Sequence, residues 1–156
     1  MLPPAALEVL GRLAPGFRLI ERGSYPDSVA RSAHESPDAG LVFLRGDFQG
    51  LGRTDYTVVG YQRGSYRVVA LFAGADGTFR ALDVIPPASE ADMTLSPGVP
   101  PLLLESDKCE AACWHGLKPR VIVVTWFLAS RFGVHQTRYV WDGLSEFMLD
   151  EVIDDP

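Results

Sequence analysis

The sequence LVFLRGDFQGLGRTDYTVVGYQRGSYRVVALFAGADGTFRALDVI, residues 41–85, decides the fold. Its strand-like runs alternate with a period of two and are rich in Val, Tyr and Phe, which favour strands. Arg63-Gly64 and the Gly-rich run at residues 74–77 separate these runs and supply the positive-φ positions of tight turns. The pattern predicts a four-stranded antiparallel meander over this stretch.

The C-terminal half shows the same pattern after a Pro-rich connection at residues 86–100. Strands are predicted in LLLES (102–106), PRVIVVTWF (119–127), GVHQTRYVW (133–141) and, at the end of the chain, EFMLDEVI (146–153). A second antiparallel meander therefore follows the first. With 156 residues, 47% of them hydrophobic and 22% charged, the chain is predicted to form a single β-rich α+β domain over residues 1–156.

The N-terminal segment predicts a short amphipathic helix at residues 3–14, because it begins with proline and ends at Pro15-Gly16. Its apolar side chains recur three or four residues apart. We expect a stripe of Leu7, Leu10 and Leu13 to pack on the sheet. Residues 17–21 predict a first strand, and residues 26–37 either a loop or a short helix that begins near Asp27.

The net charge of −6 comes from the end of the chain. The last fifteen residues hold six acidic residues and no Lys or Arg: Asp142, Glu146, Asp150, Glu151, Asp154 and Asp155. The remaining 14 acidic residues match the 14 Lys and Arg residues, which are scattered singly. A nucleic-acid-binding protein needs clustered cations, so this function is not expected.

The sequence predicts no membrane span, because no apolar run approaches the length needed to cross a bilayer. The N-terminal residues have neither a basic start nor a long apolar core, so no signal peptide is expected in them. This expectation is compatible with export, because signal peptides are removed from mature proteins.

Residues 41–61 resemble, in strand-loop-strand order, the calcium-loop segment of FG-GAP-type repeats and related bacterial extracellular modules. In that family a loop of the form D-x-D-G-D-G-x-x-D leads into a strand that begins D-Y or D-L. The matching residues here are Asp47, Gly50, Gly52 and Asp55, while Gln49 and Leu51 stand where the family carries acidic or amide ligands. The later YVWDG, residues 139–143, resembles the aromatic strand and turn that ends many such modules.

The ligand count of this loop predicts a structural turn that does not bind calcium. Calcium prefers six to eight oxygen ligands, but Leu51 offers no side-chain oxygen and Gln49 offers a neutral one. Gly50 and Gly52 still permit positive-φ turns, and Asp47 can accept hydrogen bonds from loop amides. The resemblance itself implies a bacterial protein that is periplasmic or secreted.

The two cysteines, Cys109 and Cys113, form the pattern C-x3-C-x-H with His115. The alternatives are a disulfide between them, two free thiols, or half of a zinc site. A structural zinc site needs four ligands, but the chain has no further cysteine. Its only other histidines are His34 and His135. A small hydrolase that uses Cys113, His115 and His135 is the alternative enzymatic hypothesis.

The sequence contains none of the common catalytic or nucleotide-binding motifs. Glu105 and Asp107 are interpreted as solvated acids that flank a strand. Most of the large aromatic residues are expected in the core or in cross-strand pairs, and any on a polar face are candidates for a partner surface. They are Trp114, Trp126, Trp141, Tyr56, Tyr61, Tyr66 and Tyr139.

These observations favour a non-catalytic bacterial binding or accessory module of a periplasmic or secreted protein, with an inhibitor or immunity-type protein as one form of it. The partner expected is another protein, and no cofactor or metal is expected. The alternatives are the Cys/His hydrolase and a cytoplasmic protein-interaction domain.

Overall fold

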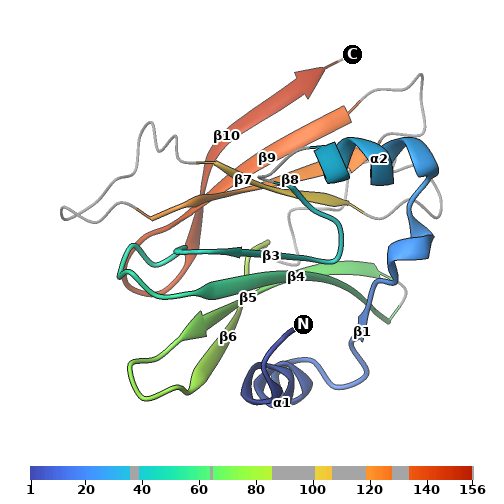
Figure 1. The fold of residues 1–156 in the computed structure, drawn as a ribbon. Helices are drawn as coiled ribbons and strands as arrows, with labels where there is room; N and C mark the ends of the chain where they lie inside the picture. The colour runs from blue at the N-terminus through green and yellow to red at the C-terminus, as the bar shows by residue number, and fades with distance from the viewer. Residues whose placement is uncertain (36–38, 64, 86–100, 107–118, 128–133, 156) are drawn as a thin grey trace.

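The computed structural model describes residues 1–35, 39–63, 65–85, 101–106, 119–127 and 134–155. Within them, two five-stranded antiparallel sheets lie face to face. Helix α1 (Pro4–Leu13) lies on the side of the first sheet that faces away from the second (Figure 1). The prediction of a β-rich α+β fold with two antiparallel meanders and a short N-terminal helix is confirmed.

The first sheet contains the meander predicted from residues 41–85. Its strands are β1 (Arg18–Leu19), β3 (Phe43–Gly46), β4 (Asp55–Gln62), β5 (Ser65–Ala73) and β6 (Phe79–Asp83). The order is β1-β4-β5-β6, and β3 also pairs with β4. The short strand β1 pairs with one end of β4, at Gly60 and Tyr61, whereas β3 pairs with the other end.

The second sheet contains the second predicted meander and one further strand. Its strands are β2 (Ala39–Gly40), β7 (Leu102–Ser106), β8 (Val121–Phe127), β9 (Val134–Trp141) and β10 (Phe147–Asp155). The order is β10-β9-β8-β7-β2. A register shift between Leu149 and Glu151 marks a β-bulge in β10.

The chain crosses from the second sheet to the first between β2 and β3, through Leu41 and Val42. Gly40 is required at this bend, because a Cβ atom there would lie 2.2 Å from the carbonyl oxygen of Phe43. The buried Tyr25 hydroxyl hydrogen-bonds to the carbonyl oxygen of Leu41 and lies 2.9 Å from that of Pro101. Burial raises the pKa of Tyr25 far above its ordinary value, so the hydroxyl keeps its proton.

Two helical segments precede this crossing. They are the 3-10 turn η1 (Arg22–Ser24) and helix α2 (Asp27–Glu35). Of the two alternatives for residues 26–37, the helix that begins at Asp27 is therefore the one observed. Ala33 of α2 is buried in the core between the sheets.

The core between the sheets is built from the inward-facing residues of both. The largest contributors include Phe48, Val59, Val68, Phe72, Leu103, Ile122, Trp126, Tyr139 and Trp141. At one edge, Phe72 packs edge-on against Trp141 with ring centroids 4.8 Å apart. The Arg80 guanidinium lies over both rings, 5.8 and 5.3 Å from their centroids, and forms cation–π contacts there.

The described aromatic residues fit the prediction that they lie in the core or in cross-strand pairs. Trp126, Trp141 and Tyr139 are buried, and Tyr56 and Tyr66 are half-buried. Tyr61 is 37% exposed and forms a cross-strand pair with Tyr66, with centroids 5.5 Å apart. Trp114 lies outside the described residues.

Helix α1 buries a different stripe from the one predicted. Leu2, Ala6 and Leu10 pack on the outer face of the first sheet, whereas Leu7 and Leu13 are 44% and 37% exposed. The prediction was wrong for these last two leucines. Residues four apart lie on one helix face, so the small Ala6 continues the stripe between Leu2 and Leu10 and allows a close approach to the sheet.

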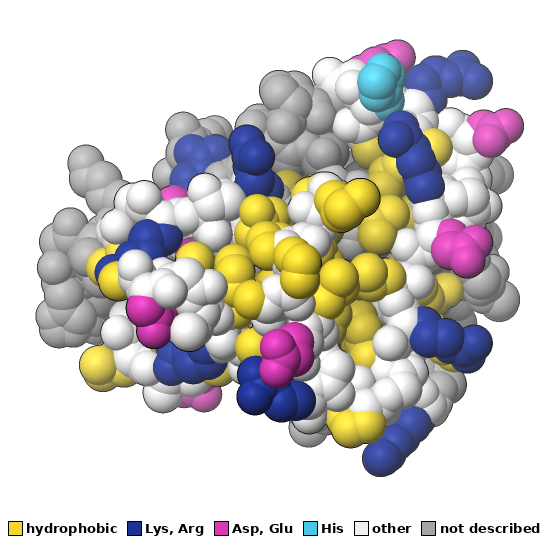
Figure 2. Space-filling view, turned by 60° about the horizontal axis from the view of Figure 1, so that its bottom comes forward, with side chains coloured by type: hydrophobic (Ala, Val, Ile, Leu, Met, Phe, Trp, Pro, Cys, Tyr) yellow, Lys and Arg dark blue, Asp and Glu magenta, His cyan; other side chains and the backbone are white. Residues whose placement is uncertain are grey.

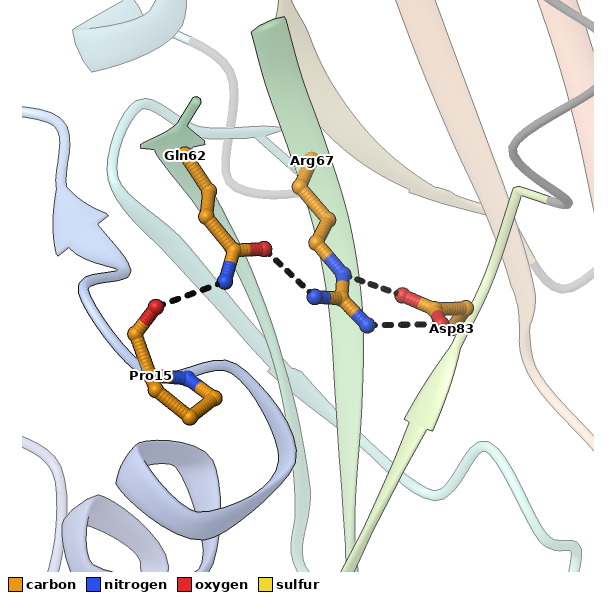
Figure 3. A network of polar contacts seen from close by, with 4 residues as sticks. All are labelled: Pro15, Gln62, Arg67 and Asp83. Atoms are coloured by element: carbon orange, nitrogen blue, oxygen red, sulfur yellow. Dashed lines mark hydrogen bonds and ion pairs between the residues drawn. The ribbon is translucent and has the colours of Figure 1, made fainter. Parts of the chain in front are cut away.

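A polar network ties the end of α1 to the first sheet (Figure 3). The Gln62 side-chain amide donates to the carbonyl oxygen of Pro15 at 2.8 Å and accepts from Arg67 at 2.6 Å. Arg67 also donates two hydrogen bonds to the Asp83 carboxylate, at 2.6 and 2.8 Å. The three side chains come from β4, β5 and β6, so the network crosses three adjacent strands.

The packing of α1 predicts that Leu10→Ala lowers the free energy of unfolding by about 2–5 kcal/mol, because it removes a buried side chain and leaves a cavity. The matched change Leu7→Ala on the exposed side should alter it by no more than about 0.5 kcal/mol. Urea unfolding of both variants measures the difference. Equal stabilities would contradict the observed orientation of α1.

Candidate functional site

The loop between β3 and β4 is held by Asp47 and two glycines. Gly50 and Gly52 both have φ of 72°, as the sequence predicts. The two carboxylate oxygens of Asp47 accept hydrogen bonds from the backbone N–H groups of Leu51 and Gly52, at 2.9 and 2.7 Å. Both oxygens therefore hold the turn of the loop.

Asp55, at the end of the same loop, is fully buried. Its carboxylate accepts hydrogen bonds from the backbone N–H of Gln49 (3.1 Å), the Gln49 side-chain amide (2.9 Å) and the backbone N–H of Ala73 (2.8 Å). Burial raises the pKa of Asp55 above its ordinary value, although these hydrogen bonds oppose the shift. The stability that this shift contributes is therefore greatest at low pH and is lost as the pH rises through the raised pKa.

Gln49 takes a position where the resembled family carries a metal ligand, but here its side chain acts as a donor. Besides Asp55, its amide nitrogen donates to the carbonyl oxygen of Ala73 at 3.2 Å. All four carboxylate oxygens of Asp47 and Asp55 face N–H groups. The Gln49 side-chain amide thus donates a hydrogen bond to the Asp55 carboxylate, which in a metal loop would bind a cation.

Of the residues in the Cys/His hypothesis, the structure describes only His135. Cys109, Cys113 and His115 lie outside the described residues, as does Asp107. His135 lies on β9 directly opposite Trp126 of β8. In the described part of the chain, no group of three or more His, Cys, Asp or Glu residues is arranged to hold a metal ion. The hydrolase and the disulfide both stay predictions.

An apolar surface remains on the outer face of the first sheet where α1 does not cover it. Helix α1 lies over β5 and β6, and the opposite half of the face belongs to β1, β3 and β4. The register places Phe43 beside Val58 and Leu19 beside Gly60 on this outer side. Figure 2 shows hydrophobic side chains gathered in the middle of the side of the molecule that carries α1, with charged side chains around them.

We call this surface the outer apolar face and define it by Leu19, Phe43 and Tyr56 on β1, β3 and β4, together with Phe79 of β6 at the margin next to α1. Phe43 and Leu19 are each 36% exposed, and Tyr56 and Phe79 are half-buried. The Tyr56 ring lies between the other two aromatic rings, with centroids 6.4 Å from Phe43 and 6.1 Å from Phe79. The sequence singled out Tyr56 as an aromatic strand residue, but not the row of three rings.

A pocket of about 350 Å³ lies beside the chain crossing between the sheets. Its lining includes Arg22 of η1, the Ala33–His34 end of α2 and residues 40–43 of the crossing. Phe43 therefore borders both this pocket and the outer apolar face. Sequence reasoning missed the pocket, because residues 22–40 are polar and show no period that indicates a site.

Comparisons with known proteins add no relative: no family model, curated protein or solved structure matches this chain. The resemblance to FG-GAP-type repeats therefore stays a prediction. None of the described helices combines the length and apolar character needed to cross a membrane.

The burial of Asp55 predicts that Asp55→Ala lowers the free energy of unfolding by at least about 3 kcal/mol, because three donors around this buried carboxylate lose their acceptor. Asp47→Ala should cost only about 1 kcal/mol, since water can reach the two exposed N–H groups that it frees. Chemical unfolding of both variants gives the comparison. A larger loss for Asp47→Ala would contradict the internal role of Asp55.

The occupied carboxylates predict that calcium does not stabilise the protein. A site saturated at a thousand times its Kd would raise the free energy of unfolding by about 4 kcal/mol. We expect an unchanged melting temperature when millimolar calcium is added after dialysis against a chelator. A rise that Asp47→Ala removes would show that the loop binds calcium.

Proposed function

We propose that this protein is a non-catalytic binding module that recognises another protein through the outer apolar face. The observation that carries the proposal is the row of three aromatic rings, Phe43, Tyr56 and Phe79. Phe43 and Tyr56 lie on strands that α1 leaves open, and Phe79 ends the row on β6, beside α1. Aromatic side chains at the centre of an interface contribute much of its binding free energy.

The geometry of the row suits recognition. Strands β3, β4 and β6 fix the backbone of the three rings, and each ring has a neighbour that restricts its rotation. Little side-chain entropy is therefore lost when a partner covers them. Arg45, next to Tyr56 across the strand pair, is exposed at the margin and can contribute a polar contact.

Three carboxylates in the described part of the chain are engaged within the fold, which supports a binding role over a catalytic one. Asp83 is engaged by Arg67, and Asp55 accepts three hydrogen bonds within its loop. Asp142 holds the turn between β9 and β10 by accepting from three backbone N–H groups. Each of these acids stabilises the fold where it lies.

The biological setting follows from the sequence and is part of the proposal. A periplasmic or secreted bacterial module, of the accessory, inhibitor or immunity type, fits the resemblance of the β3–β4 loop to extracellular modules. The acidic end of the chain, with six acids in the last fifteen residues, fits a protein that binds a basic partner.

Site-specific photo-crosslinking tests the proposed surface. A benzophenone amino acid is placed at Phe43 on the face, or at the exposed Ala75 in the β5–β6 turn as the control. In extract of the source organism, we expect a discrete protein adduct from position 43 and none from position 75. Leu19→Asp should remove that adduct while leaving the melting temperature within a few degrees, since Leu19 is partly exposed.

Identical adducts from both positions would show that the contacts are unspecific. Absence of any adduct from position 43, with the protein folded, would reject the outer apolar face as the binding surface.

A further inference from the structure

The pocket beside the chain crossing combines buried lining residues with two nitrogen-bearing side chains. Its interior is formed by the buried residues Ala33, Gly40 and Leu41, and Arg22 and His34 are exposed members of its lining. The volume of about 350 Å³ is within the range of small-molecule sites. Arg22 and His34 come from different helical segments, so the fold brings them together.

These two side chains are available to a ligand. Within the described part of the chain, the ion pairs are Arg12 with Glu8 and Arg67 with Asp83, and neither Arg22 nor His34 takes part in them. No side-chain hydrogen bond in that part of the chain engages Arg22 or His34 either. A guanidinium presents five N–H donors, and an imidazole carries at least one N–H in either protonation state.

The part of the pocket lining formed by residues 40–43 is held in place by several contacts. Gly40 brings the backbone of the crossing against the carbonyl of Phe43, and the Tyr25 hydroxyl holds the carbonyl of Leu41. The segment is also paired at both ends, Gly40 with Leu103 and Phe43 with Val58. A ligand therefore enters a site whose backbone needs little rearrangement.

We propose that this pocket binds a small organic carboxylate with an apolar body. The Arg22 guanidinium and the His34 N–H bind the carboxylate, and the apolar body lies against Ala33, Leu41 and Phe43. Arginine matches the two oxygens of a carboxylate with two parallel N–H donors, which gives both attraction and orientation. The pocket and the proposed protein-binding surface are different sites that meet at Phe43.

A titration followed by amide NMR on the full-length protein tests this site, with 3-phenylpropionate as the probe. We expect saturable shifts of the backbone amides of residues 40–43. The uncharged analogue 3-phenylpropionamide should bind at least about tenfold more weakly, because it cannot form charge-assisted hydrogen bonds.

Variants separate the pocket from general anion binding. Arg22→Ala should weaken 3-phenylpropionate binding by about tenfold or more. Arg31→Ala should leave it unchanged, because Arg31 is exposed on the same helix as His34 but is outside the pocket lining. Equal affinity for the acid and the amide, no saturable shift, or equal losses in the two arginine variants would each overturn the proposal.

Discussion

The Tyr25 hydroxyl, placed between the carbonyl oxygens of Leu41 and Pro101, is the contact around which the two sheets are joined. Leu41 belongs to the chain crossing, and Pro101 lies directly before β7. One buried side chain thus connects the N-terminal segment, the crossing and the second sheet. Gly40 and the Phe43 carbonyl approach closely at the same point, so this bend of the crossing leaves no room for a side chain at residue 40.

The sequence predicted the two meanders well, because each strand pairs with its neighbour in the chain and shows a period of two. It did not predict β2 or the crossing, since two residues are too few to show a period, and their partner β7 is distant in the chain. The face of α1 was misassigned because hydrophobicity alone favoured Leu7 and Leu13 over Ala6. Close packing on a flat sheet favoured the smaller side chain.

In the candidate sites too, some features could be predicted from residue type and others depend on contacts between distant segments. The shortage of oxygen ligands at Gln49 and Leu51 followed from their side-chain chemistry, and the positive φ of Gly50 and Gly52 followed from residue type. The hydrogen bonds that Gln49 makes to Asp55 and Ala73 could not be predicted, because Ala73 approaches the loop only through the pairing of β4 with β5. The aromatic row and the pocket likewise depend on strand register, which single-sequence patterns do not specify.

The span of the Tyr25 contact also has a consequence for synthesis of the chain. Tyr25 and Pro101 are 76 residues apart, so a ribosome adding about 5–20 residues per second needs roughly 4–15 s to make the segment between them. The hairpins of β4, β5 and β6 are local and can form during this interval, whereas their inward-facing side chains must wait for β7–β10, which are all made after Pro101. The nascent chain therefore exposes the inner side of the first sheet for seconds, and chaperone binding during this time would protect it from aggregation.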